Sequence, residues 1–190
     1  MHVGSADDDS QLMNIAILLL FAADITGHVT GGDPMTEVRI RGAGVDVKVA
    51  RPDAKGAFAF RNAASGYSMV EALSWRGKSL SYAWADWKGA PVELAMAQVK
   101  PLVGRVVMSG GGAIPKGLEV SVPGEITVKV GADGAFNLGV LPPEIYEIDL
   151  TPLRPGARVS MKLGAVESKG NEIDSRRGGG MLVITITGGK

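Results

Sequence analysis

The sequence predicts an all-β protein built from two tandem β-sandwiches of about seven strands each. Three observations predict it. Apolar residues alternate with polar ones in steps of two, glycine and proline interrupt the chain at short intervals, and one set of glycine turns occurs twice. No stretch between these interruptions carries the apolar stripe of a globular helix. Short alternating strands joined by turns are typical of sandwiches.

Three stretches show the two-residue alternation most clearly. In each of them the apolar residues are expected to face a core and the intervening polar residues to face water. The apolar members are Val45, Val47 and Val49; Ile126, Val128 and Val130; and Val159, Met161 and Leu163.

The chain repeats itself after 77 to 78 residues. The sequence Ile-Thr-Gly-His-Val at residues 25–29 recurs as Leu-Val-Gly-Arg-Val at residues 102–106, and residues 54–60 recur as residues 132–138. The offset is 77 residues from Ile25 to Leu102 and 78 from Gly56 to Gly134. Two landmarks that agree within one residue indicate a tandem duplication. We therefore expect sandwiches at residues 24–98 and 99–190, joined semi-rigidly by the short linker that ends at Pro101.

An apolar run precedes the first repeat, at residues 15–21. Similar runs end each repeat, so residues 1–23 are interpreted as the tail strand of a preceding repeat. A secretory signal peptide is the alternative, but Asp7 to Asp9 stand where basic residues are expected, and Phe21 is bulky for a cleavage site. Burying most of the run is worth on the order of 10 kcal/mol. It should therefore dock on the chain's own first sandwich or add to a neighbour's sheet, with these assembly residues: Ile15, Ile17, Leu19 and Phe21.

The two repeats share an order of motifs. In the first repeat the motifs are Ile25-x-Gly27-x-Val29, the 45–49 alternation, Asp53-x-x-Gly56-x-Phe58-x-Phe60 and Gly66-Tyr67. The second repeat is similar from Leu102-x-Gly104-x-Val106 through Asp133-Gly134-x-Phe136 to Tyr146. This order resembles the carboxypeptidase regulatory-like domain, although the second repeat has Glu144-Ile145 where the family has a glycine before the tyrosine.

The resemblance implies a prealbumin-like, immunoglobulin-like β-sandwich that serves as an accessory module of exported bacterial proteins. Its matched residues are turn glycines, turn aspartates and core side chains, so no catalytic residue carries across. The resemblance implies a location outside the cytoplasm, either extracellular, at the cell surface or periplasmic.

Composition argues against several functions. Lys and Arg number 20, and so do Asp and Glu, which leaves no basic excess for nucleic acid. Cysteine is absent, only His2 and His28 are histidines, and no apolar stretch is long enough for a membrane span. We predict a non-catalytic protein without cofactor or metal. Asp7 to Asp9 are expected to form a wet loop, and Arg176 and Arg177 a flexible charged turn. An enzyme would need folding to unite acids such as Asp86 with Glu71 or Glu93.

Aromatic residues gather in one part of the first repeat. Tyr82 and Trp84 share one face of a predicted strand, and Trp87 belongs to the other. The cluster either fills the core or binds a ligand, because flat rings stack well on sugars and partner side chains. The candidate ligand-binding residues are Trp75, Tyr82, Trp84 and Trp87.

The predicted function is that of a structural spacer and protein-interaction or adhesion unit whose partner is a protein or a glycan at the cell surface. The alternatives are a carbohydrate-binding module that uses Tyr82, Trp84 and Trp87, and a strand-donating subunit that self-associates through its N-terminal strand.

Overall fold

The computed structural model describes residues 23–63, 66–176 and 179–188. Within these ranges every regular element is a β-strand, which confirms the all-β prediction. The assembly residues Ile15, Ile17, Leu19 and Phe21 lie outside the described residues. Among the described residues, no helix has the length and hydropathy to cross a membrane.

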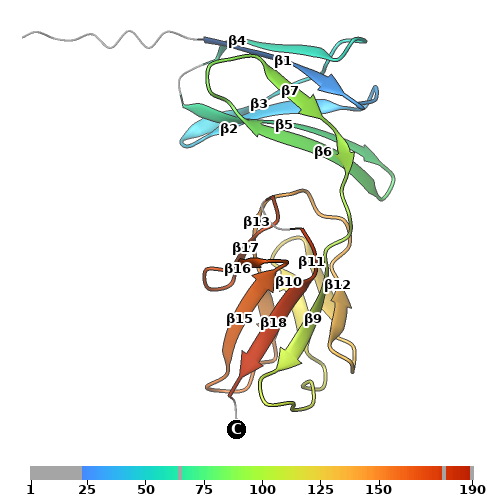
Figure 1. The fold of residues 1–190 in the computed structure, drawn as a ribbon, viewed down its shortest axis with the longest axis vertical. Helices are drawn as coiled ribbons and strands as arrows, with labels where there is room; N and C mark the ends of the chain where they lie inside the picture. The colour runs from blue at the N-terminus through green and yellow to red at the C-terminus, as the bar shows by residue number, and fades with distance from the viewer. Residues whose placement is uncertain (1–22, 64–65, 177–178, 189–190) are drawn as a thin grey trace, which may run out of the picture.

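The strands fall into a first half, residues 23–98, and a second half, residues 99–188 (Figure 1). The first half contains β1 (Ala23–Thr30), β2 (Glu37–Gly42), β3 (Val45–Ala50), β4 (Ala57–Ala63), β5 (Tyr67–Arg76), β6 (Ser79–Asp86), β7 (Val92–Ala95) and β8 (Ala97–Gln98). The second half contains β9 (Val103–Met108), β10 (Glu119–Val122), β11 (Ile126–Lys129), β12 (Ala135–Asn137), β13 (Ile145–Glu147), β14 (Asp149–Thr151), β15 (Arg158–Leu163), β16 (Val166–Glu167), β17 (Glu172–Asp174) and β18 (Leu182–Thr187). The described residues thus form eight and ten strands, where seven per repeat were expected.

Two sheets enclose the core of the first half. One has the order β4-β1-β7 and the other β3-β2-β5-β6-β8. Ile25 from β1, Ile40 from β2 and Val70 from β5 belong to a single cluster of buried residues, so the two sheets pack face to face.

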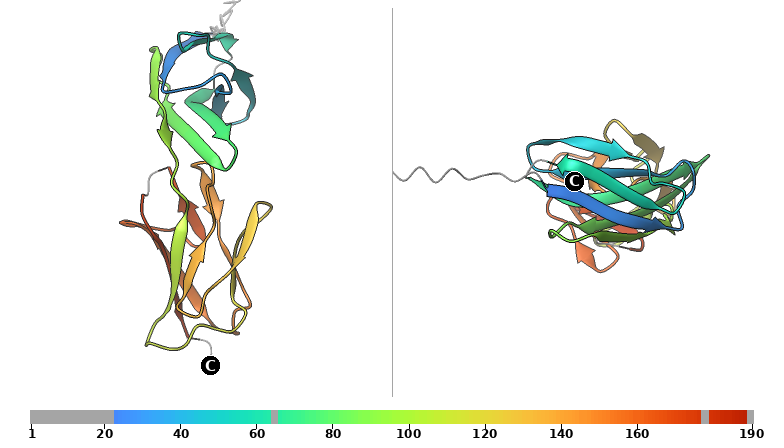
Figure 2. Two further views of the ribbon diagram at one scale, coloured as in Figure 1. Left: turned by 90° about the vertical axis from the view of Figure 1, so that its right-hand side faces the viewer. Right: turned by 90° about the horizontal axis from the view of Figure 1, so that it is seen from above.

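The second half has its own core. A five-stranded sheet, β12-β9-β18-β15-β16, faces the shorter sheets β11-β10-β14 and β13-β17. Val106 from β9, Val120 from β10 and Ile184 from β18 are members of one buried cluster. Figures 1 and 2 show the two halves stacked along the long axis of the molecule, joined by the segment that runs from β7 into β9.

A glycine at the middle of each half's first strand sets the spacing of its neighbours. Gly27 on β1 pairs with Phe58 on one side and Val92 on the other, and Gly104 on β9 pairs with Phe136 and Leu182 in the same way. A Cβ atom on either glycine would collide with the phenylalanine ring and with the carbonyl oxygen of the parallel strand. The repeated glycine is therefore required by close packing of an aromatic ring over the strand.

The second repeated glycine lies in a turn that joins onto the same strand. Gly56 and Gly134 have φ angles of 89° and 85°, which favour glycine. The carbonyl oxygen of each glycine accepts a hydrogen bond from the strand: the amide of Val29 donates to Gly56 O at 2.8 Å, and that of Val106 donates to Gly134 O at 2.8 Å. The two motifs found by sequence thus occupy matching positions in the two halves.

The two halves differ in the sheet to which one strand belongs, β15 in the second half and β6 in the first. In the second half β15 pairs with β18, in the same sheet as β9. In the first half the strand that follows β5 is β6, which stays beside β5. As a result, among the described strands β7, the counterpart of β18, pairs only with β1.

The predicted alternation is confirmed in some strands and wrong in another. On β15, Met161 and Leu163 are buried, and Ser160 and Lys162, which alternate with them, are exposed. On β3, by contrast, Val47 and Val49 are 49% and 54% exposed. The physical reason is that β3 is an edge strand and the valines' face of its sheet is directed away from the core.

Replacing Gly27 or Gly104 with alanine should destabilise the protein by about 1–3 kcal/mol, because the new methyl group forces the ring and the neighbouring strand apart. Gly112→Ala is the matched control, since its Cβ would meet only Met108 at 3.6 Å, an ordinary contact. Chemical denaturation measures the difference. Equal stability of Gly27→Ala, Gly104→Ala and the control would contradict the packing role of these glycines.

Candidate functional site

Three of the candidate ligand-binding residues, Trp75, Tyr82 and Trp84, lie on the outer face of the sheet β3-β2-β5-β6-β8. Along β5 and β6 the side chains alternate, so Val70 and Ala72 enter the core, whereas Leu73 and Tyr82 form a pair on the outer face. In Figure 1 this sheet is the layer of the first half nearest to the second half. The aromatic residues are thus positioned beside the junction between the halves.

Tyr82 is buried in a small apolar cluster of its own. It packs with Leu73 and Leu80, and Trp84, Val99 and Val140 complete the cluster. Val99 comes from the segment that joins the halves, and Val140 comes from the loop after β12. The cluster therefore contains side chains from both halves, and Tyr82, only 7% exposed, offers no ring face to a ligand.

A buried carboxylate lies next to this cluster. Glu71 on β5 is 1% exposed and accepts hydrogen bonds from Nε of Arg41, at 2.6 Å, and from the hydroxyl of Tyr82, at 2.9 Å. Burial, with the adjacent Glu71 carboxylate, raises the pKa of Tyr82 far above its ordinary value. Tyr82 is therefore a fixed hydrogen-bond donor at physiological pH.

Arg41 links the first half to the second. Its Nη2 also donates to Oε1 of Glu144 at 3.2 Å, so a single guanidinium pairs with one carboxylate from each half. Burial opposes its charge, but Glu71 and Glu144 more than offset this and raise the pKa of Arg41. Glu144 is the residue that departs from the family pattern, and in the structure it makes this bridge.

Arg176 makes a second contact across the junction. Its guanidinium lies over the ring of Trp84, with 5.9 Å between Cζ and the ring centroid, and donates to both carboxylate oxygens of Asp174 at 2.9 Å. Hydrogen bonding to Asp174 raises the pKa of Arg176. Arg176 lies in a turn, as expected, and its side chain is held there by Asp174 and Trp84.

The two remaining tryptophans have different surroundings. Trp87, directly after β6, is half-buried against the core of the first half. Trp75 is 41% exposed near the end of β5. Of the four candidate residues, Trp75, Tyr82 and Trp84 therefore share the outer face of β5 and β6, whereas Trp87 packs toward the core.

A shallow cavity of about 270 Å³ opens beside the junction. Both arginines and Trp84 line it, together with Met69 and Asp86. The guanidinium of Arg176 also contacts the sulfur of Met69, at 3.9 Å. Sequence reasoning missed the role of Arg41 and Glu144; the only signal for it was the break in the repeat at Glu144.

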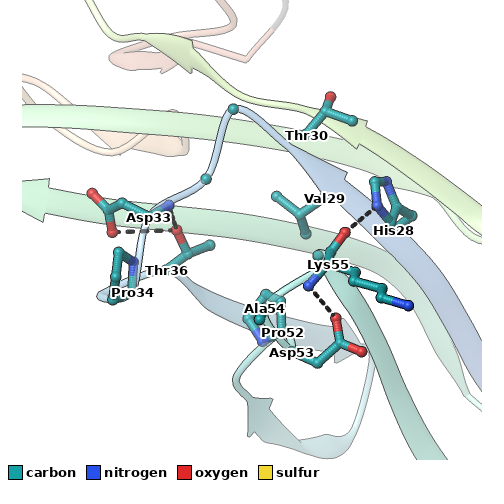
Figure 3. A pocket seen from close by; sticks show the side chains of 13 residues that line it. His28, Val29, Thr30, Asp33, Pro34, Thr36, Pro52, Asp53, Ala54 and Lys55 are labelled. Atoms are coloured by element: carbon teal, nitrogen blue, oxygen red, sulfur yellow. Dashed lines mark hydrogen bonds between the residues drawn. The ribbon is translucent and has the colours of Figure 1, made fainter.

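A larger cavity of about 720 Å³ lies at another part of the first half, between the loop after β1 and the loop before β4 (Figure 3). Val29, Pro34 and Pro52 provide apolar walls. His28 on β1 is 39% exposed there, and its Nε2 lies 2.5 Å from the carbonyl oxygen of Lys55.

Asp33 is the best-connected polar residue of this cavity. One carboxylate oxygen accepts from the hydroxyl of Ser74 at 2.8 Å, and the other accepts from Nε of Arg76 at 2.6 Å. Hydrogen bonds from these two side chains lower the pKa of Asp33 from 3.8 to about 2. Asp33 therefore connects the β1–β2 loop to β5 through these hydrogen bonds.

Of the acids considered for catalysis, Glu71 and Asp86 share the outer face of β5 and β6, and Glu93 lies apart from them on β7. Glu71 is paired with Arg41, Asp86 is exposed at the end of β6, and Glu93 is exposed on β7, where it lies 3.6 Å from His28. Within residues 23–63, 66–176 and 179–188, no group of three or more His, Asp or Glu side chains is arranged to hold a metal ion.

Comparison of the chain with protein-family models and with curated proteins found no match.

Asp33 should make stability dependent on pH below about 4. Because its pKa is depressed from 3.8 to about 2, its contribution is complete above pH 4 and is lost as the pH falls toward 2. Asp33→Asn should lower the free energy of unfolding at neutral pH and flatten its decline between pH 4 and 2, as measured by denaturation across that range. Asp86→Asn, at an exposed site, is the control. Curves for wild type and Asp33→Asn that run parallel would contradict the assignment.

Proposed function

We propose that the chain is a non-catalytic structural spacer and protein-interaction unit, in which two tandem prealbumin-like sandwiches are held in a fixed relation. Such a unit would present a partner-binding surface at a set distance from its point of attachment. The family resemblance supports a place in an exported bacterial protein, outside the cytoplasm.

The observation that carries the proposal is the shared junction centred on Arg41. A free tether between two domains would leave their facing surfaces independently solvated. Here Arg41 pairs with Glu71 from its own half and with Glu144 from the other, and the Tyr82 cluster includes Val140. Both a polar and an apolar contact therefore oppose rotation of one half against the other.

The apolar Tyr82 cluster and the buried Glu71 carboxylate should contribute most of the free energy that holds the two halves together. The Arg41–Glu144 pair is partly exposed, at 32% and 40%, and such pairs contribute only about 0–1 kcal/mol. Glu71 is different, because a buried carboxylate without a partner is strongly destabilising. Because the buried Glu71 carboxylate must be paired, its ion pair with Arg41 fixes the position of the guanidinium. The guanidinium in that position then orients the side chain of Glu144.

One observation favours the second candidate, a carbohydrate-binding module. The ring of Trp75 is 41% exposed, unlike that of Tyr82. An exposed indole can stack on the flat face of a sugar ring. Tyr82 and Trp84 are already occupied by the junction, so we assign this alternative function to Trp75 first.

Loosening the junction should make the two halves tumble more independently. Glu144→Ala with Arg176→Ala removes both polar contacts and leaves the Arg41–Glu71 pair in place. We expect the wild type to show one rotational correlation time by ¹⁵N relaxation and the double variant to show shorter, unequal values for its halves. Glu125→Ala with Arg158→Ala, two exposed sites in the second half, is the matched control. Independent tumbling of the wild type would refute the spacer proposal.

The carbohydrate alternative is tested by tryptophan fluorescence. Soluble polysaccharides should shift or quench the emission if the module binds them, and Trp75→Ala should abolish that response without loss of stability. Trp84→Ala and Trp87→Ala should instead reduce stability, because both rings pack against buried clusters. A flat titration across a broad panel of glycans would eliminate this alternative.

A further inference from the structure

The larger cavity of the first half lies where β1 ends, between the β1–β2 loop and the β3–β4 loop. Its volume of about 720 Å³ falls within the range of about 300–1,000 Å³ that is usual for ligand sites. Figure 3 shows Val29 between the two walls, with the charged ends of Asp33 and Lys55 directed away from it to either side. The space around Val29 is therefore suited to an uncharged group.

Hydrogen bonds hold both walls of the cavity in place. In the β1–β2 loop the amide of Asp33 donates to the hydroxyl of Thr36 at 2.7 Å, and the same loop is connected to β5 as described above. In the β3–β4 loop one carboxylate oxygen of Asp53 accepts from the amides of Lys55, at 2.8 Å, and Ala57, at 2.9 Å. Because each loop is fixed by its own side chains, the cavity is formed before any partner arrives.

The matching region of the second half can be found from the turns that precede β2 and β10. Thr36 directly precedes β2, and Leu118 directly precedes β10. Each closes a turn in which its amide donates to the carbonyl oxygen three residues earlier, so the two positions correspond. The residue that precedes this turn is Gly32 in the first half and Ile114 in the second.

The β3–β4 loop has a similar counterpart, the β11–β12 loop. Pro52 and Val130 each precede the residue whose amide donates across the base of the turn, to Ala57 O and Ala135 O respectively. Pro52 therefore corresponds to Val130.

The second half fills this region with its own aliphatic side chains. Leu118 is fully buried, and Ile114 and Val130 pack against the same core. Their three counterparts, Gly32, Thr36 and Pro52, all line the cavity of the first half. The cavity thus lies where the first half has a glycine, a hydroxyl and a proline ring in place of three aliphatic side chains.

The geometry at Gly32 shows where the missing side chain would point. A Cβ atom at this position would lie 3.0 Å from Oγ1 of Thr36 and 3.4 Å from Cγ1 of Val29, two residues of the cavity lining. A side chain at position 32 would therefore be directed toward the cavity. Val29 itself is 5% exposed and provides an apolar contact for whatever enters.

We propose that this cavity binds a branched aliphatic side chain, isoleucine, leucine or valine, presented by an extended segment of a protein partner. The side chain contacts Val29 between the rings of Pro34 and Pro52 and takes the place that Ile114 takes in the second half. This inference rests on the proposed protein-interaction function and identifies the surface that performs it.

A peptide with the sequence of the second half's own loop is the probe. Acetyl-Gly-Gly-Ala-Ile-Pro-Lys-amide reproduces residues 111–116, and its proline holds the isoleucine in an extended conformation. One buried side chain supports binding in the millimolar range, so the peptide is titrated to about 10 mM against the isotopically labelled full chain. We expect saturable NMR shifts of the Val29 methyl groups and of the Gly32 and Thr36 amides.

The peptide with alanine in place of isoleucine is the matched ligand control. It should bind on the order of tenfold more weakly, because it buries less apolar surface. Equal shifts with both peptides, no saturable shift, or shifts confined to residues outside the cavity would each overturn the proposal.

A pair of variants places the binding at this cavity. Ala54 is exposed and lines the cavity, so Ala54→Trp should narrow its mouth and abolish the saturable shifts while the chain stays folded. Ala59→Trp adds the same ring on the exposed face of β4, outside the cavity lining, and should leave peptide binding unchanged. Equal binding by the two variants would overturn the assignment.

This proposal and the spacer proposal fail separately. A single rotational correlation time without peptide binding would overturn the aliphatic site and leave the fixed junction intact. Saturable binding by a chain whose halves tumble independently would support the site and refute the spacer.

Discussion

Close approach of an aromatic ring to a glycine in the middle strand is the constraint on which each half depends. Phe58 occupies the space above Gly27, and Phe136 occupies the space above Gly104, where any Cβ would collide. This contact sets the register of the strands on both sides of β1 and of β9. The tight turns at Gly56 and Gly134 then lead into β4 and β12, which pair with β1 and β9. The other sheet of each half therefore packs on a sheet whose strands are fixed in position.

The contact between the two halves is made by the outer face of the sheet β3-β2-β5-β6-β8. In an isolated sandwich this face would carry polar residues, but here it presents Leu73, Leu80 and Tyr82 around the buried Glu71. Such a face needs a cover that is apolar at one point and cationic at another. Val140 of the second half provides the apolar cover, and Arg41, held in place by Glu144, neutralises the carboxylate.

The features predictable from sequence were those with a local cause. Alternation in steps of two follows from strand geometry, and the repeated glycines follow from turns and close packing within a short segment, so both were found. The junction has no local cause. Arg41 and Glu144 are 103 residues apart and meet only after folding, and nothing in either segment marks the other. Only the substitution of Glu144 for the expected turn residue indicated that the position had a different role. The exposure of Val47 and Val49 was unpredictable for the same reason, because whether a strand lies at an edge depends on the whole sheet.

The central claim is that two separate cores are each organised around a glycine-bearing middle strand. Amide hydrogen exchange measured by NMR tests it most directly. The account predicts two sets of slowly exchanging amides, one in β1, β4 and β7 and the other in β9, β12 and β18, with the amides of Val29 and Val106 in the slow class of each. Slow exchange confined to one half, or centred on the edge strands β3 and β11, would contradict the account.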